Sequence, residues 1–347
     1  MKAGLLIGLN EFDVREIEKP VPGPNEVLIK VKAAGICGSD IHKMQSEWKY
    51  GLPMVMGHEF AGIVEEVGLE VQQVQAGDRV AVAPLIPCRE CPYCRAGKYQ
   101  LCEDYKMIGS QRYGGFAEYV VVPEENVLNI GEMSFAVAAM IEPLAVAAHG
   151  VIGLDVQLGD TVAVFGLGTI GILSVQWLQI AGAKKIIGID LDQAKLEKAF
   201  MYGVTDTINV MREPLEERIL ELTDGLGVDI SLECAGSSIT EEQCLLVTKK
   251  GGKIGYQGIA YSDVMMRQKA FENIFRREYS IKGFWNSYSA PFPGKEWQHT
   301  IDFLQQGRIE VKSLISHRFS LDQLQEAFDL TVQRKESYSK VMIFPQQ

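Results

Sequence analysis

The chain has 347 residues, 47% of them hydrophobic, and a formal net charge of −11. This length and hydrophobicity suffice for two domains with large cores. The acidic balance and the lack of a Lys/Arg-rich run exclude nucleic acid as the expected partner, because phosphate backbones bind basic surfaces. No uncharged apolar run of about eighteen residues is present, and the N-terminal segment lacks a signal-peptide core, so we expect no membrane partner.

Short apolar segments separated by glycine and proline occupy the chain up to about residue 145. Apolar and polar side chains alternate in residues 26–36, 62–68, 78–84 and 117–123. Such alternation is typical of half-buried strands. We therefore expect an irregular antiparallel or barrel-like β domain in this part of the chain.

The pattern changes near Asp160, where uninterrupted apolar strands begin to alternate with helices. Strands are predicted at 161–166, 185–190, 206–210, 228–236, 251–259 and 279–285, and helices at 169–183 and 191–203. This alternation indicates βαβ units and a parallel sheet covered on both faces. Two further helices, at 294–307 and 321–334, and a strand at 340–345 complete the predicted elements.

Four cysteines form the most specific motif of the chain, spaced C-x2-C-x2-C-x7-C: Cys88, Cys91, Cys94 and Cys102. Four thiolates this close in sequence can surround one tetrahedral ion, and sulfur ligands favour zinc. The alternative is a set of buried or disulfide-bonded cysteines. Seven cysteines in all, an odd number, fit metal binding in a reducing compartment better than a disulfide framework. We therefore predict a structural zinc and a cytoplasmic location.

A glycine-rich turn, Gly166-Leu-Gly168-Thr169-Ile170-Gly171, follows a predicted strand and begins a predicted helix, and Asp190 ends the next strand. This context is that of a dinucleotide site, in which the glycines and the helix N-terminus meet the pyrophosphate. Asp190 would bind the adenosine ribose and repel a 2′-phosphate, which favours NAD over NADP. The alternative is that the glycines only pack the turn and Asp190 caps the following helix.

A second, mixed set of metal-ligand residues comprises Cys37, His58, Glu59 and Glu142. A cysteine, a histidine and a carboxylate suit a catalytic zinc, which leaves one position for water or substrate. The sequence alone does not show that Cys37 and Glu142 converge, and single cysteines and histidines often only pack.

These motifs together identify the chain as similar to the zinc-containing medium-chain dehydrogenases/reductases. The matching segments are 33–42, 56–68, 77–82, 87–102, 114–123, 141–150 and 164–173. The resemblance implies an α/β plus β fold: a GroES-like catalytic domain at 1–148 and 290–347, with a Rossmann NAD-binding domain, a doubly wound parallel sheet, at 149–289. Glu142 as third ligand resembles the polyol dehydrogenase branch, and segments 107–119 and 283–297 resemble galactitol-1-phosphate 5-dehydrogenases.

The resemblance also implies roles near the catalytic zinc. It implies ligation by Cys37, His58 and Glu142, with Glu59 near the metal or on it intermittently. Ser39 would take the proton of the substrate hydroxyl, with His42 as a candidate relay. Asp40 either orients the His58 imidazole or is a simple turn residue.

The expected reaction is the zinc- and NAD-dependent oxidation of a polyol phosphate, most specifically of galactitol 1-phosphate to tagatose 6-phosphate. Candidate donors to the phosphate group are Lys43, Arg112, Asn286 and Tyr288, although each alone also suits an ordinary surface position. The alternatives are an unphosphorylated polyol, a vicinal diol or threonine as substrate, a non-catalytic zinc protein, and a zinc-free quinone or enoyl reductase. A homodimer or homotetramer is expected, with the edges of the cofactor-domain sheet as the candidate contact.

Overall fold

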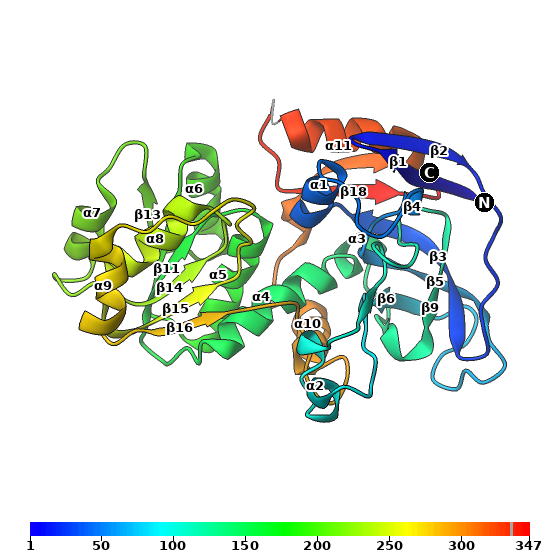
Figure 1. Ribbon diagram of the computed structural model, residues 1–347, viewed down its shortest axis with the longest axis horizontal. Coiled ribbons are helices and arrows are strands. Elements are labelled where there is room, and N and C mark those ends of the chain that lie inside the picture. The colour runs from blue at the N-terminus through cyan, green and yellow to red at the C-terminus, as the bar shows by residue number, and fades with distance from the viewer. Residues whose placement is uncertain (334–335) are drawn as a thin grey trace. The chain divides into compact units, whose positions relative to one another are not determined.

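The computed structural model of the chain describes residues 1–333 and 336–347 and divides into two units (Figure 1). Unit 1 comprises Met1–Pro143 and Ser287–Gln347, and unit 2 comprises Leu144–Asn286. Both crossings lie a few residues before the predicted boundaries. Helix α4 (Ile141–Gly153) continues through the first crossing, so no change of sequence pattern marks it. Arg334, predicted as the end of a helix, lies outside the described residues.

The main sheet of unit 1 confirms the predicted β domain and extends it with strands from the end of the chain. Its strands within the described residues are β3 (Glu26–Gly35), β5 (Glu59–Val67), β6 (Arg79–Val82), β9 (Tyr119–Pro123), β10 (Val127–Asn129), β17 (Ile315–Ser320) and β18 (Lys340–Phe344). Most neighbours are antiparallel, but β17 and β18 are parallel. Gly35 pairs with Glu59 across β3 and β5, which brings the start of β5 beside the end of β3.

A smaller sheet made of β2 (Glu11–Glu16), β1 (Lys2–Gly8) and β4 (Met54–Val55) was not predicted. The β1–β2 hairpin turns at Leu9 and Asn10, and Asn10 has a φ of 56°. Asparagine tolerates this left-handed conformation better than most residues. The short strands β7 (Leu85–Ile86) and β8 (Lys106–Met107) pair with each other.

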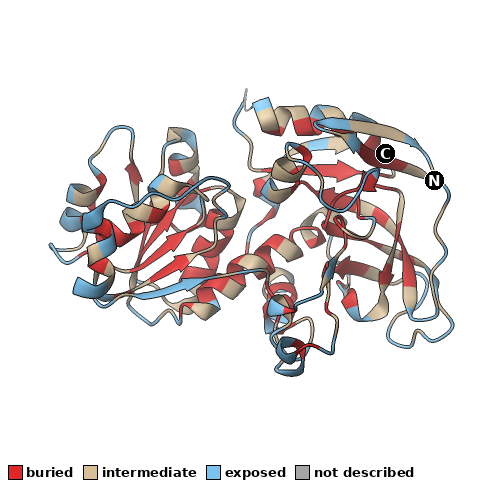
Figure 2. Ribbon diagram, in the orientation of Figure 1, coloured by how far each residue is buried: buried red, intermediate tan, exposed pale blue. Residues whose placement is uncertain are grey.

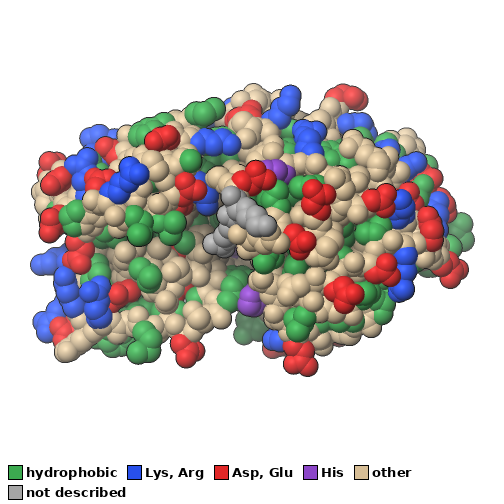
Figure 3. All heavy atoms as spheres, turned by 90° about the horizontal axis from the view of Figure 1, so that it is seen from above, with side chains coloured by type: hydrophobic (Ala, Val, Ile, Leu, Met, Phe, Trp, Pro, Cys, Tyr) green, Lys and Arg blue, Asp and Glu red, His purple; other side chains and the backbone are tan. Residues whose placement is uncertain are grey.

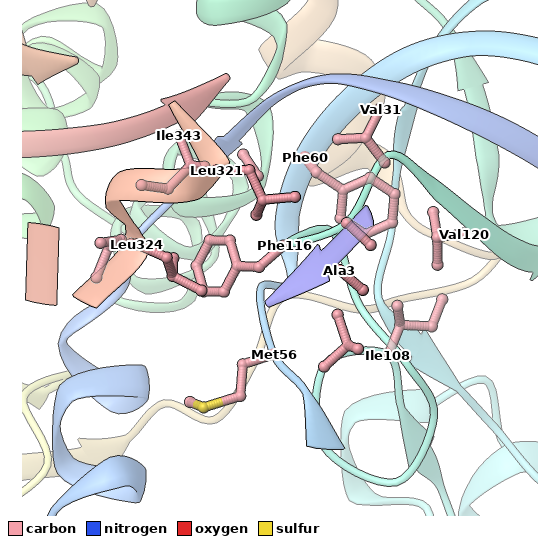
Figure 4. Close-up of a cluster of buried hydrophobic side chains, with 14 of the residues drawn as sticks. Ala3, Val31, Met56, Phe60, Ile108, Phe116, Val120, Leu321, Leu324 and Ile343 are labelled. Carbon is pink, nitrogen blue, oxygen red and sulfur yellow. The ribbon is translucent and has the colours of Figure 1, made fainter. Parts of the chain in front are cut away.

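The hydrophobic core of unit 1 joins segments from both ends of the chain. In Figure 4 the side chains of Phe60, Phe116 and Ile343 gather with those of Ala3 and Leu324, among others. Their elements are β1, β5, β18, α11 (Leu324–Gln333) and the segment before β9. The other α-helices that lie wholly in the described part of unit 1 are α1 (Gly38–Met44), α2 (Pro92–Arg95), α3 (Phe135–Ala138) and α10 (Lys295–Gln305). Burial of this shared core ties the two chain segments of unit 1 together.

Unit 2 is a parallel six-stranded sheet, as predicted, in the order β13-β12-β11-β14-β15-β16. The strands are β11 (Thr161–Phe165), β12 (Lys185–Asp190), β13 (Asp206–Asn209), β14 (Val228–Glu233), β15 (Thr248–Tyr256) and β16 (Ser280–Gly283). The helices are α5 (Thr169–Ala181), α6 (Gln193–Ala199), α7 (Leu215–Leu222), α8 (Ser238–Val247) and α9 (Gln268–Arg276). The central strands are buried and β16 is exposed along its length (Figure 2).

One helical stretch, Phe135–Gly153, has the length and mean hydropathy, 1.8, of a membrane-spanning helix. It escaped the sequence criterion because Glu142 interrupts the apolar run. Sixty-one per cent of its most apolar window is buried within the protein, as in the core helix of a globular domain.

Over the face in Figure 3, acidic and basic side chains are interspersed with hydrophobic ones.

Candidate metal and cofactor sites

Cys37, His58 and Glu59 converge at one end of the main sheet in unit 1. Cys37 follows β3 and precedes α1, whereas Glu59 begins β5. Ligand atoms of the three side chains lie within 4.8 Å of one another. Gly57, the residue before His58, has a φ of 92°, and a Cβ on Gly57 would lie 2.9 Å from the Phe116 ring. A sulfur, an imidazole nitrogen and a carboxylate at this spacing suit a divalent ion such as zinc.

Asp40 and His58 form a buried pair beside this cluster. His58 Nδ1 lies 3.2 Å from Asp40 Oδ1, and the Cys37 amide donates to Asp40 Oδ2 at 3.1 Å. Burial acts to raise the pKa of Asp40, but His58, Lys43 and the Cys37 amide hold it below its usual value. Because Nδ1 lies beside the Asp40 carboxylate, Nε2 is the nitrogen left for a metal. The geometry therefore matches the orienting role rather than a simple turn.

Glu142, at the start of α4, is not part of the three-residue cluster but lies within its electrostatic reach. Burial raises the pKa of Glu142 to about 7; the His58 charge opposes this rise and the Glu59 charge adds to it. A carboxyl group in such surroundings is costly to ionise without a cation nearby. The donor set of Cys37, His58 and Glu142 therefore fits a divalent ion, which would relieve that cost.

Glu59 has a partner that the sequence did not reveal. Lys340 Nζ, from the first residue of β18, lies 2.6 Å from Glu59 Oε2 and donates to the Ile36 carbonyl at 3.1 Å. A Cβ at position 35 would lie 2.3 Å from Glu59 Oε2, so a side chain there would displace the Glu59 carboxylate. The available signal was a lysine at the head of an otherwise apolar strand.

Helix α1 carries the other residues predicted near the metal. Ser39 and His42 are three positions apart on α1, both partly buried, which places them on the same side of the helix. Lys43 Nζ donates to Ser110 Oγ at 2.8 Å, and its charge reaches Asp40. Lys43 is thus the substrate candidate that lies beside the metal cluster.

The remaining substrate candidates have other surroundings. Arg112 pairs with Glu26 at 2.6 Å. Tyr288 is 1% exposed, and its hydroxyl accepts a hydrogen bond from the Leu85 amide at 2.9 Å. Asn286 belongs to unit 2, and its buried Nδ2 has no hydrogen-bond partner in the described part of the chain. Arg112 and Tyr288 therefore have structural partners that account for them.

The second cluster comprises Cys88, Cys91, Cys94 and Cys102, whose sulfur atoms lie within 4.8 Å of one another. The amides of Cys88, Cys91 and Cys94 donate to sulfur atoms of the same cluster at 3.2–3.4 Å. Backbone amides of Glu103 and Cys94 lower the pKa of Cys91 to about 6. All four are free thiols rather than disulfides. Four converging sulfurs, three of which accept backbone amides, are the arrangement of a closed structural zinc site.

The glycine-rich turn of unit 2 has room for a ligand. A Cβ at Gly166 would lie 2.8 Å from Ala235 and one at Gly171 1.9 Å from the Gly166 carbonyl, so both glycines serve close packing. A Cβ at Gly168 would meet nothing within 4 Å. Gly168 precedes α5, whose first residues are Thr169 and Ile170. Open space at the N-terminus of a helix fits a pyrophosphate group.

Asp190 accepts a hydrogen bond from the glycine-rich turn and does not cap helix α6. Its carboxylate accepts from the amide of Leu167 at 2.8 Å, and from those of Leu191 and Asp192 at 2.8 and 2.9 Å. The N-cap of α6 is Asp192, which accepts from the Ala194 amide. The alternative in which Asp190 caps that helix is therefore wrong.

Two known domain families match the chain. Residues 23–132 match the alcohol dehydrogenase GroES-like domain, and residues 169–306 match the zinc-binding dehydrogenase domain. The chain belongs to the zinc-dependent medium-chain alcohol dehydrogenases. Members of this family are oxidoreductases, and the GroES-like and Rossmann architecture expected from the sequence is thereby confirmed.

Relatives of this dehydrogenase act on different alcohols. Sorbitol dehydrogenase of Bacillus subtilis is 33% identical, covering 99% of this chain and 97% of its own. Galactitol 1-phosphate 5-dehydrogenase of Escherichia coli is 32% identical, covering 97% and 99%. The crystal structure of galactitol-1-phosphate dehydrogenase from Escherichia coli superposes with a TM-score of 0.94 at 31% identity, covering 99% of this chain and 100% of that one. The family is a zinc-dependent polyol and alcohol dehydrogenase family, within which substrates differ.

Proposed function

We propose that this dehydrogenase oxidises a polyol phosphate with NAD, and specifically galactitol 1-phosphate to tagatose 6-phosphate. The observation that carries the proposal is the sulfur, imidazole and carboxylate cluster of Cys37, His58 and Glu59, with Glu142 close by. The polyol phosphate is supported by the likeness of segments 107–119 and 283–297 to galactitol-phosphate enzymes and by the Escherichia coli relative.

The chemistry divides between bound groups and the protein. When bound, a divalent ion would supply the Lewis acid that lowers the pKa of the substrate hydroxyl, and a nicotinamide would supply the hydride acceptor. Cys37, His58 and Glu142 would hold that ion, while Asp40 fixes the tautomer and orientation of His58. The Ser39 hydroxyl receives the substrate proton and His42 passes it toward solvent. Glu59, held by Lys340, supplies negative charge beside the ion.

The cofactor proposed is NAD rather than NADP. Asp190 and Asp192 together place two carboxylates where the adenosine ribose is expected, and the residue between them is Leu191. Like charges at this spacing disfavour a 2′-phosphate, and no arginine follows the strand to receive one. Each chain would carry two zinc ions, one in each cluster.

Lys43 is the proposed anchor for the substrate phosphate. Among the four phosphate candidates it is the one whose charge acts on Asp40, beside the metal cluster, and its partner is a neutral hydroxyl, Ser110. Arg112, by contrast, is neutralised by Glu26. A phosphate can replace a hydroxyl partner at little cost, whereas it would have to break an ion pair to reach Arg112.

Initial rates with galactitol 1-phosphate and with free galactitol, followed at the NADH absorbance band, test the substrate class. Lys43→Ala should raise KM for the phosphorylated substrate and leave KM for the free polyol unchanged. Arg112→Ala, which also removes one positive charge, is the matched control and should leave both KM values unchanged. Equal kcat/KM for both substrates in the wild type would remove the phosphate from the proposal. The second candidate substrate is then an unphosphorylated polyol. The similarity of the chain to Bacillus subtilis sorbitol dehydrogenase supports this candidate.

A second copy of the chain is the proposed partner at the edge of the unit 2 sheet. Strand β16 is exposed at all of its residues, and α9, the helix before it in the chain, exposes Phe271 by 53% and Phe275 by 58%. An open strand edge and exposed aromatic rings are each suited to pairing with an identical copy. Light scattering should show a dimer or tetramer for the wild type and a smaller species for Phe271→Asp.

The free thiols of the cysteine clusters agree with the proposed cytoplasmic location.

A further inference from the structure

Glu233 is a fully buried carboxylate at the carboxyl end of β14. Strand β14 pairs with β11, and Glu233 lies opposite Phe165, the residue before the glycine-rich turn. The chain passes from β11 outward to β12 and β13, then returns to β14 on the other side of β11. Cofactors of such sheets bind over the carboxyl ends of the strands at this reversal. Glu233 therefore lies beneath the expected cofactor site without belonging to any described motif.

The side-chain partners of Glu233 are uncharged donors from the loop that follows it and from the first turn of α8. Glu233 Oε1 accepts from the amides of Ala235 and Gly236 at 2.9 and 3.0 Å and from Thr240 Oγ1 at 2.7 Å. Burial raises the pKa of Glu233, although these donors oppose the rise. A buried carboxylate without a cation is expensive, and core packing alone would be served by an apolar residue. What the carboxylate achieves is the fixed conformation of residues 234–240.

This loop is the middle member of three that pack against one another. Ala235 lies against Gly166, where a Cβ would come within 2.8 Å of it. On the other side, a Cβ at Gly258 would lie 2.2 Å from the Gly236 amide nitrogen. Gly166 follows β11 and Gly258 follows β15. A displacement of residues 235–236 would therefore reach the loops on both sides.

The two halves of a dinucleotide occupy opposite sides of the strand reversal. Asp190, at the end of β12, marks the adenosine side. The nicotinamide half must then lie over the loops after β14 and β15. We propose that Glu233 is a positioning residue for the nicotinamide half of the cofactor, acting through the Ala235–Gly236 backbone that it holds. This inference rests on the proposed NAD site.

Binding measurements on the zinc-loaded enzyme distinguish the two halves. NADH is titrated by its fluorescence, and ADP-ribose, which lacks the nicotinamide, is titrated by displacement of NADH. Glu233→Ala should weaken NADH binding by about tenfold or more, as expected for the loss of hydrogen bonds to a charged acceptor. ADP-ribose affinity should stay within about twofold of the wild type. Glu233→Gln keeps one acceptor oxygen and should restore most of the NADH affinity.

Two further variants protect the test. Thr240→Val removes one donor to Glu233 and should give a smaller loss of the same kind if Glu233→Ala does not fold. Glu241→Ala, at another buried carboxylate on α8, is the control for general destabilisation and should leave both ligands unaffected. Equal weakening of NADH and ADP-ribose, or no weakening of either, overturns the role of Glu233. Failure of the wild type to bind ADP-ribose overturns the NAD site itself.

Discussion

Lys340 and Glu59 form a buried ion pair, with 2.6 Å between Nζ and Oε2 and side-chain exposures of 3% and 1%. Burial alone would lower the pKa of Lys340, but the charges of Glu59 and Cys37 hold it above its usual value. The pair commits one oxygen of Glu59 to the last strand of the sheet, while Glu59 also lies in the metal cluster. Lys340 thus competes with a metal ion in the cluster for the Glu59 carboxylate.

Replacing Lys340 by methionine should destabilise the protein by about 3–5 kcal/mol, because Glu59 would be left as a buried charge without its partner. The free energy of unfolding in urea measures this effect. The double variant Glu59→Gln, Lys340→Met removes both charges and should recover much of the lost stability. Equal stability of the single and double variants would contradict a coupled pair.

The two cysteine-containing clusters should hold metal independently. Cys37→Ser should reduce the zinc content from two ions per chain to one and abolish turnover, while the fold is retained. Cys94→Ser should also lose one ion, but at a cost to thermal stability, because a closed cysteine site stabilises the loop that it binds. Elemental analysis and thermal unfolding test both variants. A Cys37→Ser enzyme with two zinc ions and normal turnover would remove Cys37 from the metal site.

Metal affinity of the apoenzyme should fall as the pH is lowered through about 7. The pKa of Glu142 is raised to about 7, so below that pH the carboxyl group carries a proton that must leave before it binds an ion. Calorimetric titration with zinc at pH 6 in buffers of different ionisation enthalpy counts the protons released. Glu142→Gln should release about one proton fewer than the wild type. The same proton count in both would place Glu142 outside the metal shell.

Removing the charge of Asp190 should relax cofactor selectivity. Asp190→Asn keeps an oxygen for the Leu167 amide but no longer repels a 2′-phosphate. The ratio of kcat/KM for NAD to that for NADP should fall by about tenfold, equivalent to about 1.4 kcal/mol. Asp192→Asn, which retains the cap of α6, separates the contribution of the neighbouring charge. An unchanged ratio in both variants would show that selectivity has another origin.

Local patterns predicted those parts of the fold that depend on neighbouring residues. The strands of unit 2, its helices α5 and α6 and the glycine-rich turn follow from periodicity and spacing within short segments. The four-cysteine cluster is likewise contained in one loop, and the structure brings its sulfur atoms together.

Features that depend on distant residues could not be predicted in this way. The Lys340 contact to Ile36 joins residues 304 positions apart, and the Arg112–Glu26 pair spans the β domain. The β1–β2 hairpin lacked the usual Asn-Gly turn signal, since Leu9 precedes Asn10. The crossing between units falls inside a continuous helix. In each case the missing information was which segments meet.

Because the catalytic unit is assembled from both ends of the chain, its folding on the ribosome is constrained. The nucleotide-binding unit, Leu144–Asn286, is a single stretch and can fold as soon as it emerges. Strand β3 must meanwhile wait for β18, which pairs with it through Met342 and Ile343. Until translation reaches that strand, the end of β3 at Ala34 and Gly35 lacks its partner, although β9 already covers residues 26–30. Nascent chains stalled before residue 340 should therefore be the ones that recruit chaperones.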